Sequence, residues 1–218
     1  MAGLVIEPMR WLTLLGLGLY HGLNPGMGWL FAVALGLQER SGKAVLRALP
    51  PLAAGHAASV ALMVTVLLIG QRGLPDSVLR PLLAALLIGF GAWKLIRPRH
   101  PRWVGMRVGG RDLFLWSFLM ATAHGAGLML LPVFLVGSAP CHGPAAGCHA
   151  ALSTVARGWP SYLVAVALHT AAMLVTAGTV ALVVYYKLGL ALLRKSWLNL
   201  DFVWAGAMIL SGLLTLLL

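Results

Sequence analysis

Acidic side chains are scarce in this chain: five aspartate and glutamate residues stand against sixteen lysine and arginine residues in 218. Charged residues make up 10% of the sequence, whereas soluble domains carry about 25%. The acids lie at the edges of long apolar segments, at Glu7, Glu39, Asp76, Asp112 and Asp201. This scarcity excludes an ordinary soluble domain and disfavours hydrolysis by a carboxylate general base within the apolar segments.

Cysteine is equally rare, with Cys141 and Cys148 the two in the chain. Both lie in one short stretch, SAPCHGPAAGCHA, and each precedes a histidine, His142 or His149. Two cysteines exclude a disulfide-rich scaffold, and their absence from the apolar segments disfavours thiol-redox chemistry there. On an oxidising side of a membrane the pair is expected to close a small disulfide loop. A reduced loop would instead form a metal-capturing cup.

Apolar residues dominate what remains. They make up 60% of the chain, and the mean hydropathy is +0.91. A transmembrane helix needs about 20 mostly apolar residues, and six segments satisfy this: roughly 9–37, 46–70, 77–97, 112–137, 160–186 and 199–218. The first segment lacks a basic start and a small-residue cleavage site, so it is interpreted as a span rather than a signal peptide. The sequence predicts an all-α, polytopic membrane protein comprising one transmembrane domain, 1–218.

Basic residues cluster in three connections, at 40–47, 94–111 and 187–195, which hold twelve of the sixteen. In a protein with six spans these connections lie on one side of the membrane. The positive-inside rule makes that side cytoplasmic and places both termini outside, in a multi-pass protein of the inner (plasma) membrane. The net charge of +11 is therefore interpreted as a topology signal that also favours anionic lipid headgroups, and not as a nucleic-acid surface.

Four histidines lie deep inside the apolar segments, at His21, His56, His124 and His169. An ionisable residue at this depth is costly and usually functional. Each lies about nine to twelve residues into its segment, which puts all four near the bilayer centre at about 1.5 Å per residue. The sequence therefore predicts a shared site at one level of the membrane.

The histidine-bearing segments form two similar sets. His21-Gly22 and His124-Gly125 each begin a glycine-containing break, and the residues after His56 resemble those after His169. Three spans in each set would make the second enter the membrane in the opposite sense, as in many secondary transporters. The predicted architecture is two inverted three-helix repeats, about 9–97 and 112–218, joined by a basic cytoplasmic linker at about 98–111.

Proline and glycine interrupt the first span at Asn24-Pro25-Gly26-Met27-Gly28. Proline removes a backbone donor, and the freed backbone groups must face protein, water or a ligand. The stretch Gly125-Ala126-Gly127 predicts a weaker break in the fourth span. Such breaks are typical of a transporter's binding site.

The four imidazoles suit a divalent transition metal, with nickel, cobalt, zinc, iron and copper not distinguished. Asn24 offers a carbonyl oxygen and Met27 a thioether as secondary ligands, together with the Cys141, His142, Cys148 and His149 cup. The favoured function is a secondary metal transporter, with protons as the coupling ion. Two alternatives stay open: a b-type haem protein with paired axial histidines, and a membrane-embedded metalloenzyme with histidine ligands.

The motif His-Gly-x-x-Pro-Gly, formed by His21, Gly22, Pro25 and Gly26, is followed by Gly-His-Ala around His56. This pattern resembles the nickel/cobalt transporter families of the lysine-exporter superfamily. The resemblance implies a small six-span carrier with a 3+3 repeat and a histidine-based metal site. Those families usually carry an acidic residue in the first motif, where this chain has Asn24 and Met27.

Overall fold

The computed structural model of the protein describes residues 2–96, 109–130, 133, 148–188 and 200–217. Within these ranges the chain forms helices and no strand, which confirms the predicted all-α class. The elements are α1 (Ala2–Leu23), η1 (Pro25–Met27), α2 (Trp29–Gln38), α3 (Gly42–Gly73), α4 (Asp76–Ile96), α5 (Gly110–Ala123), α6 (Ala126–Met129), α8 (Cys148–Val183), η2 (Val184–Leu188) and α10 (Leu200–Leu217).

These helices overlap the six predicted segments, and three of them begin several residues earlier than predicted. Helix α1 begins at Ala2 and not at residue 9. Helix α3 begins at Gly42 and continues through Pro50 and Pro51. The carbonyls that the prolines leave without a helix partner belong to Leu46 and Arg47, whose side chains are exposed. Helix α8 begins at Cys148, so the end of the predicted Cys/His loop is helical.

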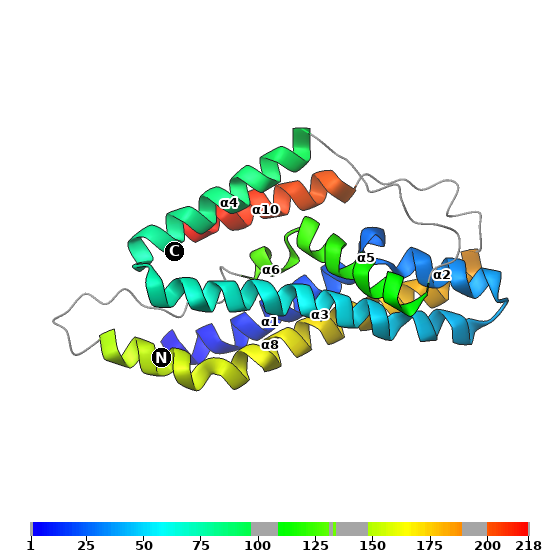
Figure 1. The fold of residues 1–218 in the computed structure, drawn as a ribbon, viewed down its shortest axis with the longest axis horizontal. Coiled ribbons are helices and arrows are strands. Elements are labelled where there is room, and N and C mark those ends of the chain that lie inside the picture. Colours follow the sequence, from blue (N-terminus) through cyan, green and yellow to red (C-terminus); the bar gives the residue numbers. More distant parts are fainter. Residues whose placement is uncertain (1, 97–108, 131–132, 134–147, 189–199, 218) are drawn as a thin grey trace.

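The helices pack in three long pairs (Figure 1): α1 lies along α8, α3 along α5, and α4 along α10. The first two pairs form a bundle, and the α4–α10 pair lies across one side of it. Leu87 of α4 and Met208 of α10 join the bundle's core beside Val60 and Ala126. Both chain ends lie at the same end of the molecule, and the turn between α2 and α3 lies at the other.

Glycines let the paired helices approach closely. A Cβ atom on Gly18 of α1 would overlap the backbone carbonyl oxygen of His169 in α8, and one on Gly55 of α3 would overlap that of Phe114 in α5. Small residues at such positions are typical of helix contacts in membranes, where close backbone packing replaces the hydrophobic effect. The glycines next to His56 and near His21 therefore set the spacing of the helices that carry the histidines.

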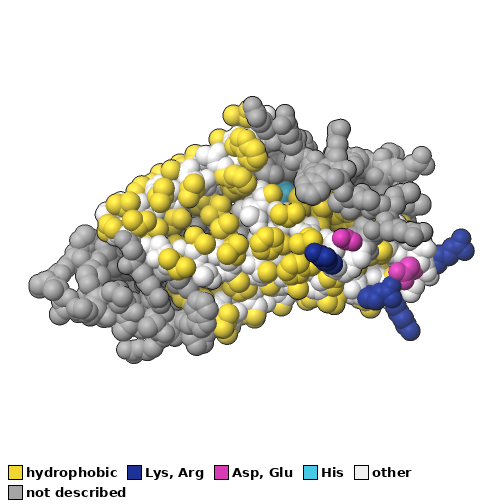
Figure 2. Space-filling model, viewed as in Figure 1, with side chains coloured by type: hydrophobic (Ala, Val, Ile, Leu, Met, Phe, Trp, Pro, Cys, Tyr) yellow, Lys and Arg dark blue, Asp and Glu magenta, His cyan; other side chains and the backbone are white. Residues whose placement is uncertain are grey.

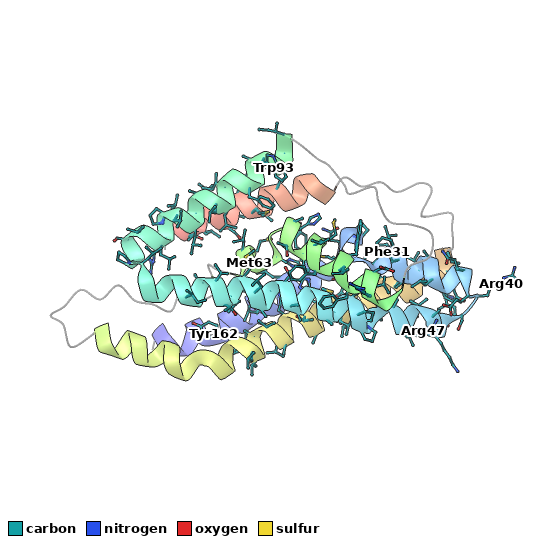
Figure 3. All side chains as sticks on the ribbon, in the orientation of Figure 1. Phe31, Arg40, Arg47, Met63, Trp93 and Tyr162 are labelled. Carbon is teal, nitrogen blue, oxygen red and sulfur yellow. The ribbon has the colours of Figure 1, made fainter. Side chains whose placement is uncertain are left out.

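Charged side chains in the described ranges gather at the end formed by the α2–α3 turn, where Arg40 and Arg47 project (Figures 2 and 3). Arg47 forms an ion pair with Glu39 across this turn, at 2.6 Å. The start of α5 and the start of η2 lie here too, because Leu113 and Val184 belong to the same buried cluster as Val45 of α3. The visible face of the remaining described surface is largely apolar (Figure 2).

Two helical stretches in the described ranges are long and apolar enough to cross a membrane, Gly42–Leu67 and Tyr162–Lys187. Shorter apolar helices occur at Trp29–Gln38, Ser77–Trp93 and Ala205–Leu216. By length and composition alone, these helices are compatible with a membrane protein.

Candidate functional site

Three of the four predicted histidines contact one another at the centre of the bundle. The ring centroids of His21 and His169 lie 5.0 Å apart, those of His21 and His56 5.5 Å, and those of His56 and His169 5.4 Å. Each ring comes from a different helix (α1, α3 or α8), and all three residues are 0% exposed. The structure thus assembles a closed imidazole triangle from residues up to 148 positions apart in the sequence (21 to 169).

His124 ends α5 and borders the break that follows α1. It is 1% exposed, and a Cβ atom built on Gly26 would lie 3.5 Å from its Cε1 atom. All four predicted site histidines are therefore buried in one region around the two helix breaks.

Backbone carbonyl groups orient three of the rings. The Nδ1 atoms of His21, His124 and His169 lie 2.7, 2.8 and 3.1 Å from the carbonyl oxygens of Leu17, Met120 and Leu14. A carbonyl can only accept, so each Nδ1 carries the proton and donates, which leaves Nε2 as a lone-pair nitrogen. Histidine ligands of metals usually have their second nitrogen fixed in this way.

His56 lacks such an anchor. Both of its ring nitrogens are buried and have no hydrogen-bond partner among the described residues, and neither does Nε2 of His169. Buried polar groups are nearly always paired, so an orphaned group indicates a ligand, an ion or a water molecule. Turning the His56 ring breaks no hydrogen bond, which makes it the most adaptable of the four.

Both predicted helix breaks are present. After α1, Gly28 has φ 106°, and after α5, Gly125 has φ 66°, a left-handed conformation that favours glycine. Two indole N–H groups satisfy carbonyls of the first break: Trp29 donates to Leu23, and Trp116 of α5 donates to Gly26, both at 3.2 Å. The breaks are therefore specific structures held by neighbouring helices.

Two secondary candidates have other contacts. The Oδ1 atom of Asn24 accepts a hydrogen bond from Gly26 N–H at 2.9 Å, so the oxygen proposed as a metal ligand is already engaged. Met27 is 1% exposed and packs in the core with Leu14 and Val60. Its thioether therefore has a packing role.

The structure describes only part of the predicted Cys/His cup. Cys141 and His142 lie outside the described residues, and Cys148 and His149 form the first turn of α8.

Hydroxyl groups near the histidines are a feature that the sequence reasoning missed. Ser59 of α3 and Thr122 of α5 form a hydrogen bond of 2.8 Å, each within one helical turn of a site histidine. Ser117 donates to the Leu52 carbonyl at 2.7 Å. The sequence could have indicated Ser59 and Thr122 by their spacing. Ser59 follows His56 by three residues, and Thr122 precedes His124 by two.

In the described part of the chain, no group of three or more histidine, cysteine, aspartate or glutamate side chains has the geometry to hold a metal ion as it stands. No protein-family model, curated protein or solved structure matches this chain. The chemistry of the site therefore has to be inferred from its own residues.

Proposed function

We propose that this protein is a membrane carrier that moves a divalent transition metal through the site formed by His21, His56, His124 and His169. The observation that carries the proposal is the triangle of fully buried imidazoles, each on a different helix. We further propose the relationship to the nickel/cobalt transporter families, with protons as the coupling ion.

The exposed surface of the helices supports a membrane location. Each of the long helices α1, α3, α4, α5, α8 and α10 has large apolar side chains exposed, including Leu12, Ile69 and Val175 at 64, 64 and 65%. A soluble monomer rarely exposes so many large apolar side chains, whereas transmembrane helices expose them to lipid. We propose six spans in the inner membrane, with the charged end in the cytoplasm and both termini outside.

The helix pairing supports an inverted repeat. In such a repeat α1 corresponds to α5, α3 to α8 and α4 to α10. The α1–α8 pair then corresponds to the α5–α3 pair, and the α4–α10 pair corresponds to itself. All three pairs are present. The two breaks also correspond, because each immediately follows a site histidine, His21 or His124. Carriers of this type bind substrate near the midplane between the repeats.

The ring spacing supports a metal ligand. With metal–nitrogen bonds of about 2.0–2.1 Å and a ring radius of about 1.1 Å, tetrahedral coordination puts imidazole centres about 5 Å apart. The observed separations are 5.0–5.5 Å. Binding requires the rings to turn so that their nitrogens converge, and His56 can do so without losing a hydrogen bond.

The same spacing disfavours haem. Two axial imidazoles on one iron have ring centres about 6 Å apart with the porphyrin plane between them, and rings in mutual contact leave no room for it. A hydrolytic metalloenzyme would need a carboxylate base beside the rings, and the two carboxylates whose side chains the structure describes, Glu39 and Asp112, are exposed. Transport is therefore the function that the site supports best.

Metal uptake by the purified protein in lipid vesicles tests the proposal. We expect nickel, cobalt or zinc to enter vesicles that contain the protein and not empty ones, and a proton gradient to change the rate. The control replaces all four histidines with alanine. Uptake or binding that survives in this variant would contradict the proposed function.

The topology has its own test, in a variant with Cys141→Ser and Cys148→Ser. We expect Lys43→Cys and Lys187→Cys to react with an impermeant maleimide from the cytoplasmic side, because the α2–α3 turn and the end of η2 lie together. Ser77→Cys, at the start of α4, should react from the outside. Labelling of positions 43 and 187 from opposite sides would exclude the six-span arrangement.

A further inference from the structure

Asn24 carries a buried donor group that has no acceptor among the described residues. Its Oδ1 atom accepts from Gly26 N–H at 2.9 Å. Because that N–H needs an acceptor, the hydrogen bond fixes which end of the amide is oxygen. The residue is 5% exposed, and its Nδ2 atom has no acceptor among the described residues. A metal cation cannot satisfy this group, since an amide NH2 only donates.

The donor lies next to the histidines. Asn24 follows His21 by three residues, and its backbone N–H donates to the His21 carbonyl at 3.1 Å. A Cβ atom on Gly26 would lie 3.1 Å from Asn24 Oδ1 and 3.5 Å from His124 Cε1. The Asn24 amide and the His124 ring therefore both border Gly26.

Among the side chains that the structure describes, none compensates the charge of a metal ion in this site. Imidazole ligands are neutral, and the two described carboxylate side chains, Glu39 and Asp112, are exposed. Burying two positive charges without a counter-charge is strongly unfavourable. The neighbouring helix α2 begins at Trp29, and its N-cap Gly28 supplies no side-chain hydrogen bond. The positive end of a helix favours an anion nearby, and broken helices in transporters use it in this way.

We propose that the metal is bound together with a small coordinating anion, such as a halide or a carboxylate, and that Asn24 donates a hydrogen bond to that anion. This inference rests on the proposed function. The anion completes the coordination of the metal, and the Asn24 amide holds it at the break between α1 and α2. The transported species is then a metal–anion pair of reduced net charge.

Metal binding measured against anion concentration tests this inference. Purified protein in lipid nanodiscs is dialysed against nickel or zinc in methanesulfonate, with chloride or formate added at constant pH and ionic strength. Charge-assisted hydrogen bonds are the stronger ones, so we expect wild-type metal affinity to rise about tenfold with either anion. Bound metal is measured by elemental analysis.

Two variants distinguish the two roles of the Asn24 amide, which are donation from Nδ2 to the anion and acceptance of the Gly26 N–H by Oδ1. Asn24→Ser keeps an oxygen that can cap Gly26 N–H, and should bind metal without the anion-dependent rise. Asn24→Asp keeps the cap and supplies a negative charge, so it should bind tightly with no added anion. The anion site alone would be overturned if the wild-type metal affinity did not change with chloride or formate. It would also be overturned if Asn24→Ser still bound metal more tightly when either anion was added. No metal binding under any condition would overturn the proposed function as well.

Discussion

Replacing His56 with leucine should abolish metal binding while leaving the protein at least as stable as before. The ring is fully buried, yet neither nitrogen has a hydrogen-bond partner in the described structure. Removing a buried, unpaired polar group relieves a desolvation cost of about 1–3 kcal/mol. A residue whose removal improves stability but ends binding has a functional role. We expect metal affinity to fall on the order of 100-fold or more, beyond the loss typical of an outer-shell change.

Elemental analysis after dialysis measures the affinity, and thermal unfolding without metal measures the stability. The control is Met173→Leu, which alters a buried side chain on α8 that belongs to the apolar cluster of Trp29 and Val33. It should keep wild-type affinity, since a volume-conserving apolar exchange costs little. A strong loss of stability in His56→Leu, with metal binding unchanged, would show that His56 is a packing residue.

Replacing Gly18 with alanine should separate α1 from α8 and weaken both the fold and the site. The added Cβ atom would overlap the His169 carbonyl oxygen and the Ala172 side chain. Overpacking of this kind typically costs about 1–3 kcal/mol. It also moves His169 away from Leu14, whose carbonyl orients its ring. We therefore expect metal affinity to fall by about 10- to 100-fold, as when an outer-shell partner is lost.

Gly16 supplies a matched control on the same helix. A Cβ atom there meets nothing within 4 Å, so Gly16→Ala should gain about 0.5–1 kcal/mol from the better helix propensity of alanine. Unfolding in a denaturing detergent compares the two variants. Equal stability and equal metal affinity in Gly16→Ala and Gly18→Ala would rule out close α1–α8 packing as the cause.

The sequence predicted the helices because the length of an apolar segment is a local property that can be counted along the chain. The shared level of His21, His56 and His169 also followed from counting residues along separate helices. Their mutual contact depends on which helices become neighbours, and local periodicity does not contain that information. The hydrogen bond from His169 to Leu14 joins residues 155 positions apart, and no short pattern indicates it.

The role of the Asn24 side chain was harder to predict, because either end of its amide could face the site. Asn24 was interpreted as an oxygen ligand because its amide contains an oxygen, but the Gly26 N–H engages that oxygen. The hydrogen bond depends on the geometry of the break, which proline and glycine identify but do not specify in detail. Pro50 and Pro51 show the converse case, since they suggest an interruption where α3 continues.

The pairing of α1 with α8 and of α3 with α5 has a consequence for biosynthesis. The long helices α1, α3 and α4 of the first half each pair mainly with a helix of the second half, so α8 must be made before α1 can bury Gly18 and His21. Until then the first half has its glycine surfaces uncovered. The imidazole triangle closes only when His169 has been made, so the first half alone lacks the complete histidine cluster.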